Sequence, residues 1–158
     1  MLYNETTNWQ SPRPMEWEPE YFRLFITHAA THKEVAHQIK EHLRKCSISC
    51  FVAHDDIQPT RDWEDEIVEA LRSMDALAAL LSSDFHESKW TDQEVGFAVG
   101  TGRLVLPLRL GLNPYGFIAK YQGYHVNNVP FTTIAQDVPK ILARHGSTSL
   151  IYAKALVK

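Results

Sequence analysis

The chain has 158 residues, 44% hydrophobic and 22% charged, which fits one globular domain with short additional segments. Its formal net charge of −3 argues against a nucleic-acid-binding protein, which usually carries a basic excess. No apolar run reaches the length of a membrane span, and the first residues lack the basic-then-apolar pattern of a secretory signal.

The spacing of cysteine and histidine argues against a disulfide framework and a metal site. Cys46 and Cys50 form no CxxC pair, so we expect both to be reduced and buried in a cytoplasmic protein. His28 and His32 are four residues apart, but they cross a strand-to-loop boundary and cannot share one helix face. We therefore expect no bound metal.

Residues 1–20 are rich in proline and show no sustained periodicity, which predicts an arm or linker. Trp9 and Trp17 are costly to leave in water, so we expect them to pack on the domain or on another chain. We divide the rest of the chain into a domain at 21–145 and a tail, or the start of a further helical region, at 146–158.

The first half of the domain alternates twice between strand and helix patterns. Residues 21–28 and 47–53 are short apolar runs typical of buried strands. A capping box, Thr31-x-x-Glu34, predicts a helix after the first strand. The second strand leads into a polar loop and then a helix with a predicted structural, core-facing stripe of Trp63, Ile67, Leu71 and Met74.

The second half repeats the alternation. Residues 76–81 and 104–110 are predicted strands, although Pro107 removes a ladder donor from the latter. The helix between them is expected to end at Gly100 and Gly102. A short fifth strand is expected within 124–131, a helix from Thr132 or Thr133, and a further helix within 150–158.

Strands that alternate with helices through short connections predict an α/β fold with a parallel sheet between two helical layers. For five strands we expect the flavodoxin-like order 2-1-3-4-5, whose ligand crevice lies at the carboxyl ends of strands one and three. Three segments should converge there, namely residues 27–31, residues 54–60 and the loop before Trp90.

Glu94 is the candidate catalytic residue at this crevice. It lies four residues after Trp90, which places both side chains on one helical face that continues as an apolar line. A carboxylate on such a line needs a partner or has a raised pKa. The alternative is a capping box formed by Thr91-x-x-Glu94. The expected convergence of loops favours the functional interpretation.

These motifs together resemble a TIR (Toll/interleukin-1 receptor) domain of the bacterial, NAD+-consuming type, over residues 21–145. The strand end Phe25-Ile26-Thr27-His28-Ala29 is similar to the first box of that family. Trp90-x-x-x-Glu94 is similar to the pattern around its catalytic glutamate, and the strand at 104–110 resembles one that usually contains a proline.

The resemblance implies cleavage of the nicotinamide–ribose bond of NAD+, giving nicotinamide and ADP-ribose or a cyclic ADP-ribose isomer. NAD+ would be the substrate, no cofactor would be needed, and the role would be bacterial anti-phage signalling or NAD+ depletion. Glu94 would be the catalytic residue. The residues expected to bind substrate are Thr27, His28, Ala29, Ala30, Phe51, Asp55, Gln58 and Trp90.

Other functions remain open at this stage. TIR domains also act as non-catalytic adaptors through TIR–TIR contacts, so we expect self-association and a possible partner domain or effector protein. A phospho-acceptor receiver domain would need an aspartate at the end of the third strand, where the chain reads Leu81-Ser82-Ser83-Asp84, and an acidic pair after the first strand, which is absent. A deoxyribosyltransferase-like enzyme would share the use of the glutamate but should not prefer NAD+.

Overall fold

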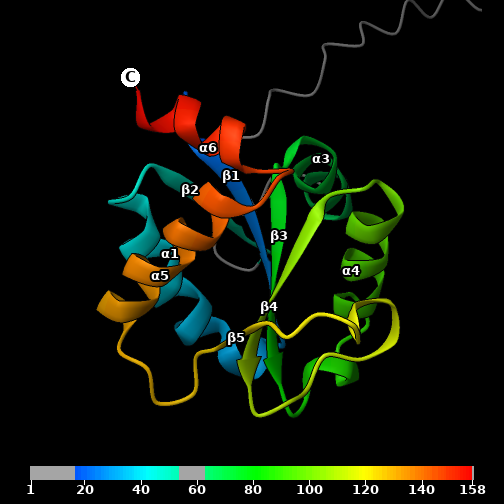
Figure 1. Ribbon diagram of the computed structural model, residues 1–158. Helices are drawn as coiled ribbons and strands as arrows, with labels where there is room; N and C mark the ends of the chain where they lie inside the picture. Colours follow the sequence, from blue (N-terminus) through cyan, green and yellow to red (C-terminus); the bar gives the residue numbers. More distant parts are fainter. Residues whose placement is uncertain (1–16, 54–62, 158) are drawn as a thin grey trace, which may run out of the picture.

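The computed structural model describes residues 17–53 and 63–157 (Figure 1). Its five strands form one sheet in the order β2-β1-β3-β4-β5, and all neighbouring strands pair in parallel. The predicted fold class and strand order are thus confirmed. The strands are β1 (Phe22–Thr27), β2 (Ile48–Val52), β3 (Ala76–Ser82), β4 (Leu104–Leu110) and β5 (Tyr124–His125).

The three central strands are apolar runs because helices cover both faces of the sheet. Every residue of β3 is buried, and five of the six residues of β1 are buried. The helices are α1 (Lys33–Arg44), α3 (Trp63–Ser73), α4 (Thr91–Gly100), α5 (Phe131–Arg144) and α6 (Ser149–Leu156). Three short 3₁₀ turns join them, η1 (Ala30–His32), η2 (Phe85–Glu87) and η3 (Gly116–Ile118).

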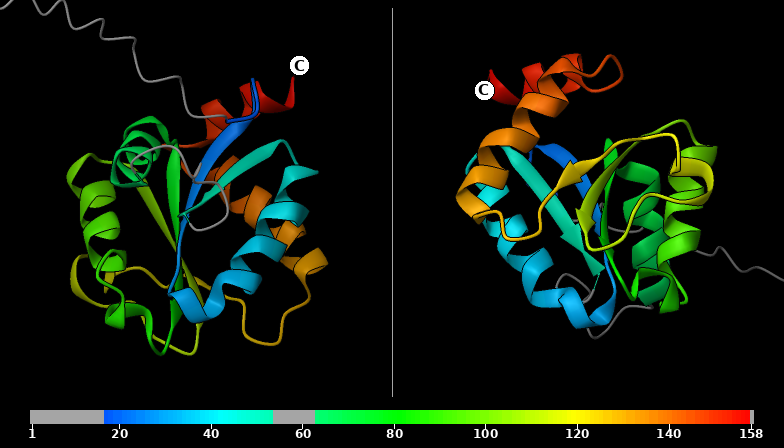
Figure 2. Two further views of the ribbon diagram at one scale, coloured as in Figure 1. Left: turned by 180° about the vertical axis from the view of Figure 1, so that it is seen from behind. Right: turned by 60° about the horizontal axis from the view of Figure 1, so that its bottom comes forward.

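Helices α1, α5 and α6 cover one face of the sheet, and α3 and α4 cover the other (Figures 1 and 2). The fold therefore has two cores. One joins Phe22, Leu24 and Ile26 to the inner sides of α1, α5 and α6. The other joins Phe25 and Phe51 to α3 and α4. Side chains of β1 alternate between these cores, as the two-residue period of a strand requires.

Trp17, just before the sheet, packs into the core under α3, and its indole Nε1–H donates to the Ser73 hydroxyl at 2.9 Å. The expectation that Trp17 packs on the domain is confirmed, and Trp9 lies outside the described residues. At the other end of the chain, Tyr152 of α6 is buried and donates a hydrogen bond to the Cys46 carbonyl at 2.8 Å.

Pro107 lies within β4 opposite Ala79 of β3, so the predicted strand forms despite its proline. It is tolerated because β5 pairs only with Leu108 and Arg109, and the ladder on that side does not include Pro107. Gly123 is required beside it, because a Cβ there would lie 2.7 Å from the Pro107 carbonyl oxygen and φ is +71°.

Three predictions about caps, helix bounds and cysteine burial are wrong. The predicted Thr31–Glu34 capping box does not form, because η1 occupies residues 30–32 and the Thr31 hydroxyl instead donates to Asp84. The α5 helix begins at Phe131, directly after Pro130, rather than at Thr132 or Thr133. Both cysteines are free, but Cys46 is half-buried rather than buried.

The carboxyl ends of the strands form the lower edge of the molecule in Figure 1, where α1 and α4 begin. Within residues 17–53 and 63–157, none of the helices combines the length and apolarity needed to cross a bilayer.

Candidate functional site

A small hollow of about 40 Å³ lies at the carboxyl ends of β1 and β2, beside the start of α4. It occupies the place where the strand order reverses between β1 and β3, the usual ligand site of this topology. Residues distant in sequence meet there as expected, although segment 54–62 lies outside the described residues. The lining residues are Ile26, Thr27, His28, Ala53, Trp63, Ile67, Ser88, Trp90 and Glu94.

Glu94 lies in the first turns of α4, and its side chain is only 4% exposed. The alternative Thr91–Glu94 capping box does not form, since no side chain caps this helix. Trp90 occupies the N-cap position, one residue earlier than a capping box requires. The Thr91 hydroxyl donates instead to the Phe85 carbonyl at 2.5 Å, which leaves the Glu94 carboxyl to face the hollow.

The surroundings of Glu94 disfavour its charged form. Burial raises the pKa of this carboxyl to about 7, and the nearby Thr27 hydroxyl lowers it in part. The Thr27 hydroxyl is itself buried and makes no hydrogen bond of standard geometry within the described residues. Its effect on Glu94 is therefore electrostatic, and the hydroxyl is able to donate to a ligand.

His28 places an imidazole in the same hollow. Its Nδ1 lies 2.8 Å from the Ala29 carbonyl oxygen. Because a carbonyl only accepts hydrogen bonds, Nδ1 carries a proton, and a neutral ring then has an acceptor at Nε2. Thr27, His28, Trp90 and Glu94 are thus brought together by the fold.

Other residues named by the sequence analysis lie elsewhere. Phe51 is in the core under α3, where its ring centroid is 5.1 Å from that of Phe25 and 6.3 Å from that of Trp17. Ala29 is buried and Ala30 is exposed in η1, and neither lines the hollow. Asp55 and Gln58 lie outside the described residues. In residues 17–53 and 63–157, no cluster of side chains is suited to hold a metal ion.

Trp63 lies at the candidate site, although its helical spacing predicts a position in the core. It was assigned to a core stripe, but it is 42% exposed and lines the hollow. Its ring centroid lies 4.9 Å from that of Trp90, with the two planes at 78°. Helical periodicity predicts an inward position, but Trp63 is the first residue of α3 and lines the hollow at the carboxyl ends of the strands. That position was the signal available in the sequence.

The fold is that of a flavodoxin-like α/β protein, and the hollow at its topological switch point is a candidate site. The family model of the TIR domain matches residues 24–137, and the chain belongs to this family. A search of curated proteins finds no match to the sequence.

Solved structures that share the fold include the following two, both at low sequence identity. The TIR domain of the Toll-related receptor TRR-2 from Hydra magnipapillata has a TM-score of 0.57 at 17% identity, covering 78% of this chain and 93% of that one. The CMP N-glycosidase BcmB from Clostridium botulinum has a TM-score of 0.50 at 15% identity, covering 73% of this chain and 97% of that one.

Proposed function

We propose that this protein is an NAD+ glycohydrolase with Glu94 as its catalytic carboxylate. The observation that carries the proposal is the buried Glu94 carboxyl in a hollow at the ligand edge of the sheet. The described lining contains no lysine or arginine that could neutralise it as a structural ion pair. Removing a carboxyl from water without such a partner is costly, and perturbed groups of this kind cluster at functional sites.

The reaction matches what one carboxylate can supply. The bond between ribose C1′ and the pyridinium nitrogen breaks, and its electron pair goes to the nitrogen, so nicotinamide leaves as a neutral molecule. Because the leaving group needs no proton, no general acid is required. Water then adds to C1′ and loses one proton, which gives ADP-ribose. Attack by a group of the same substrate in place of water would give the cyclic isomer.

In this mechanism the ionised Glu94 stabilises the oxocarbenium-like charge that develops on the ribose. A preorganised group in a site of low water content contributes about 3–4 kcal/mol to transition-state stabilisation. The Thr27 hydroxyl would donate a hydrogen bond to the carboxylate or to a ribose oxygen, and Nε2 of a neutral His28 would accept a hydrogen bond from a ribose hydroxyl.

The TIR family includes NAD+-cleaving enzymes, which supports the proposal. The structure of BcmB, named as a CMP N-glycosidase, indicates that a related fold accommodates N-glycosidic cleavage of a nucleotide. A nucleotide with a neutral base is therefore the rival substrate class. From the resemblance alone, we further propose a role in anti-phage signalling or NAD+ depletion, with TIR–TIR self-association.

The test is to incubate the purified protein separately with NAD+ and CMP and to separate the products by chromatography. We expect nicotinamide and ADP-ribose, or its cyclic isomer, from NAD+. Glu94→Gln keeps the shape of the side chain but removes its charge, and it should lower the rate of NAD+ cleavage by about 10²-fold or more.

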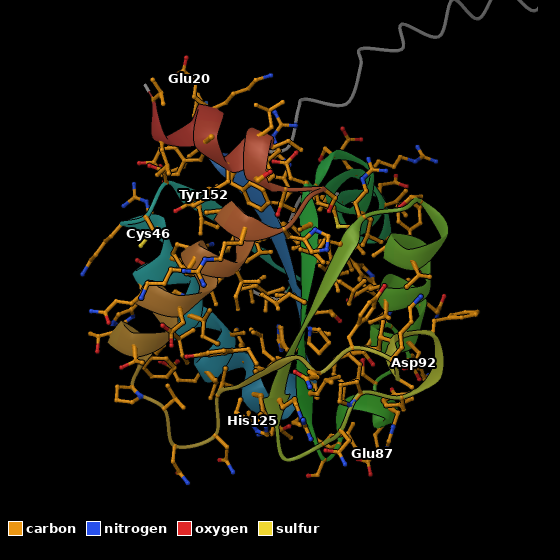
Figure 3. All side chains as sticks on the ribbon, viewed as in Figure 1. Glu20, Cys46, Glu87, Asp92, His125 and Tyr152 are labelled. Carbon is orange, nitrogen blue, oxygen red and sulfur yellow. The ribbon has the colours of Figure 1, made fainter. Side chains whose placement is uncertain are left out.

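Glu87→Gln is the matched control. Glu87 is an exposed residue of η2 at the same edge of the molecule (Figure 3) and does not line the hollow. The control should cleave NAD+ at the wild-type rate. If Glu94→Gln also keeps that rate, the catalytic assignment fails. If the wild-type protein cleaves no nucleotide, a non-catalytic adaptor becomes the better account.

A further inference from the structure

Trp63 and Trp90 come from separate helices and meet beside the hollow. Their ring centroids are 4.9 Å apart in an edge-to-face arrangement. Such a contact uses the edge of one ring and one face of the other, so at least one face of each indole takes no part in the pair. Trp63 is 42% exposed, whereas Glu94 is 4% exposed, so the aromatic pair lies nearer to solvent and the carboxyl deeper inside.

Contacts with the described residues do not bury the indole of Trp63. Ile67, one turn further along α3, is buried in the core under the sheet, as are Ala70 and Leu71. Trp63 is outside that core cluster, and its contact with Trp90 leaves much of its surface in water. Burying the rest of that apolar surface against a ligand would be favourable.

The charges around the hollow favour one class of ligand. Its described lining combines two indoles with one carboxyl and contains no lysine or arginine. A flat organic cation gains from both features, because indole faces attract cations and an ionised carboxylate attracts them further. A neutral base can stack on the rings but gains neither electrostatic contribution.

We propose that Trp63 forms the mouth of a subsite that selects a pyridinium cation over a neutral base. The inference rests on the proposed function, since the pyridinium would be the nicotinamide ring of the substrate, and it deepens that function by naming what decides between NAD+ and a neutral nucleotide. Trp63 thereby determines specificity, while Glu94 acts on the bond that breaks.

The proposal assigns different kinetic roles to the two residues. The pyridinium is positive in the bound substrate and becomes neutral as its bond to ribose breaks, so attraction to the indole faces is strongest before the reaction. Removing the Trp63 ring should therefore raise KM for NAD+ by about 5-fold (about 1 kcal/mol) with a smaller change in kcat. Glu94→Gln should act mainly on kcat.

The test compares two probes of nearly the same shape, the cation 1-methylnicotinamide and neutral nicotinamide. Dissociation constants for both are measured by NMR titration of the wild-type protein and of Trp63→Tyr, Trp63→Phe and Trp63→Leu, with melting temperatures recorded for each. We expect the wild type to prefer the cation, and we expect Trp63→Leu to reduce this preference by about 5-fold. The Tyr and Phe variants should be intermediate.

Tyr121→Leu is the matched control, because Tyr121 is 40% exposed and does not line the hollow. It should leave the preference unchanged. An unchanged preference in a folded Trp63→Leu variant, or equal losses for both probes, would overturn the proposal. If Trp63→Leu does not fold, the preference for the cation in the wild type is compared with that in Trp63→Tyr and Trp63→Phe. A stronger preference in the wild type supports the proposal, and equal preferences in all three overturn it.

The binding and turnover measurements test the subsite and the glycohydrolase separately. A wild-type protein that prefers the cation through Trp63 but does not cleave NAD+ supports the subsite and refutes the glycohydrolase. One that cleaves NAD+ with KM unchanged in Trp63→Leu supports the glycohydrolase and refutes the subsite.

Discussion

The carboxyl group of Glu94 combines two demands that oppose each other. Glu94 is 4% exposed, and this burial favours the protonated carboxyl, so its pKa is raised from 4.5 to about 7. Stabilising a developing cation requires the ionised form. Near neutral pH the two forms coexist, so small changes in pH should alter both the activity and the stability of the protein.

We expect kcat/KM for NAD+ to rise with pH through about 7. The active form is the carboxylate, which is a minor species at pH 6 and the major species at pH 8 if the pKa is about 7. The rise over these two units should be about tenfold, followed by a plateau. Initial rates at subsaturating NAD+ between pH 5.5 and 8.5 measure the profile. A flat profile across this range would contradict an essential ionised Glu94.

The same group should make the protein less stable as pH rises. Between about pH 4.5 and 7 the folded chain holds a proton on Glu94 that the unfolded chain has lost, so the free energy of unfolding falls with increasing pH over this window. Gln has no ionisable group, so the Glu94→Gln variant does not lose stability in this way. We expect Glu94→Gln to match the wild type near pH 4.5 and to be more stable by up to about 3 kcal/mol at pH 8.

Urea unfolding of both proteins at pH 4.5 and pH 8 checks this expectation. Glu87→Gln, at an exposed position, should show no pH-dependent difference from the wild type. A gap that stays constant between the two pH values would mean that Glu94 is not protonated in the fold at low pH.

At the scale of single elements, the start of α4 decides what Glu94 does. The spacing from Trp90 to Glu94 correctly places both residues on the hollow. The competing cap could not be rejected from the sequence, because Thr-x-x-Glu is compatible with a helix beginning at either of two residues. The 3₁₀ turn η2 decides between them, since its Phe85 carbonyl accepts the Thr91 hydroxyl.

This hydrogen bond should be important for the placement of α4. Thr91 is 1% exposed, so replacing its hydroxyl by a methyl group in Thr91→Val leaves the Phe85 carbonyl without this donor. We expect a loss of about 1–3 kcal/mol in unfolding free energy. Thr101→Val is the control, because its hydroxyl also bonds a carbonyl of this helix, at Phe97, but at an exposed site.

The control should change stability by less than about 0.5 kcal/mol. Thermal and urea unfolding of the two variants give the comparison. Equal effects would indicate that η2 does not fix where α4 begins.

At the scale of the whole molecule, the strand order was predictable because alternating strand and helix patterns leave few topologies, and handedness restricts them further. The position of Trp63 was not predictable from periodicity. The pattern Trp63–Ile67–Leu71 is that of a buried stripe, and Ile67 and Leu71 are indeed buried. Trp63, at the start of α3, instead lines the hollow at the carboxyl ends of the strands.

Self-association belongs to this scale as well. If assembly completes the site, as the family resemblance suggests, NAD+ cleavage per chain should rise with protein concentration. Specific activity over a hundredfold dilution series, with mass measured by light scattering at each concentration, tests this. Constant specific activity together with a constant mass would refute a concentration-dependent assembly.

Helix α6 lies beyond residues 24–137 matched by the TIR family model, but it packs on the domain. Tyr152 joins it to the first core, where its ring meets Phe22 edge-to-face with centroids 5.8 Å apart. Its hydroxyl donates to the Cys46 carbonyl, which ties α6 to the segment between α1 and β2, and both residues are labelled in Figure 3.

We therefore expect Tyr152→Ala to reduce the free energy of unfolding by about 3–5 kcal/mol, as truncation of a buried aromatic residue does. Tyr152→Phe removes only the hydroxyl and should cost about 1 kcal/mol. Leu150→Ala, on the same helix but 66% exposed, should change stability by less than about 0.5 kcal/mol. Urea unfolding measures all three. If Tyr152→Ala unfolds like Leu150→Ala, then α6 adds nothing to the cooperative core. If Tyr152→Ala instead loses about 3–5 kcal/mol of unfolding free energy, the folding unit extends past the region matched by the family model.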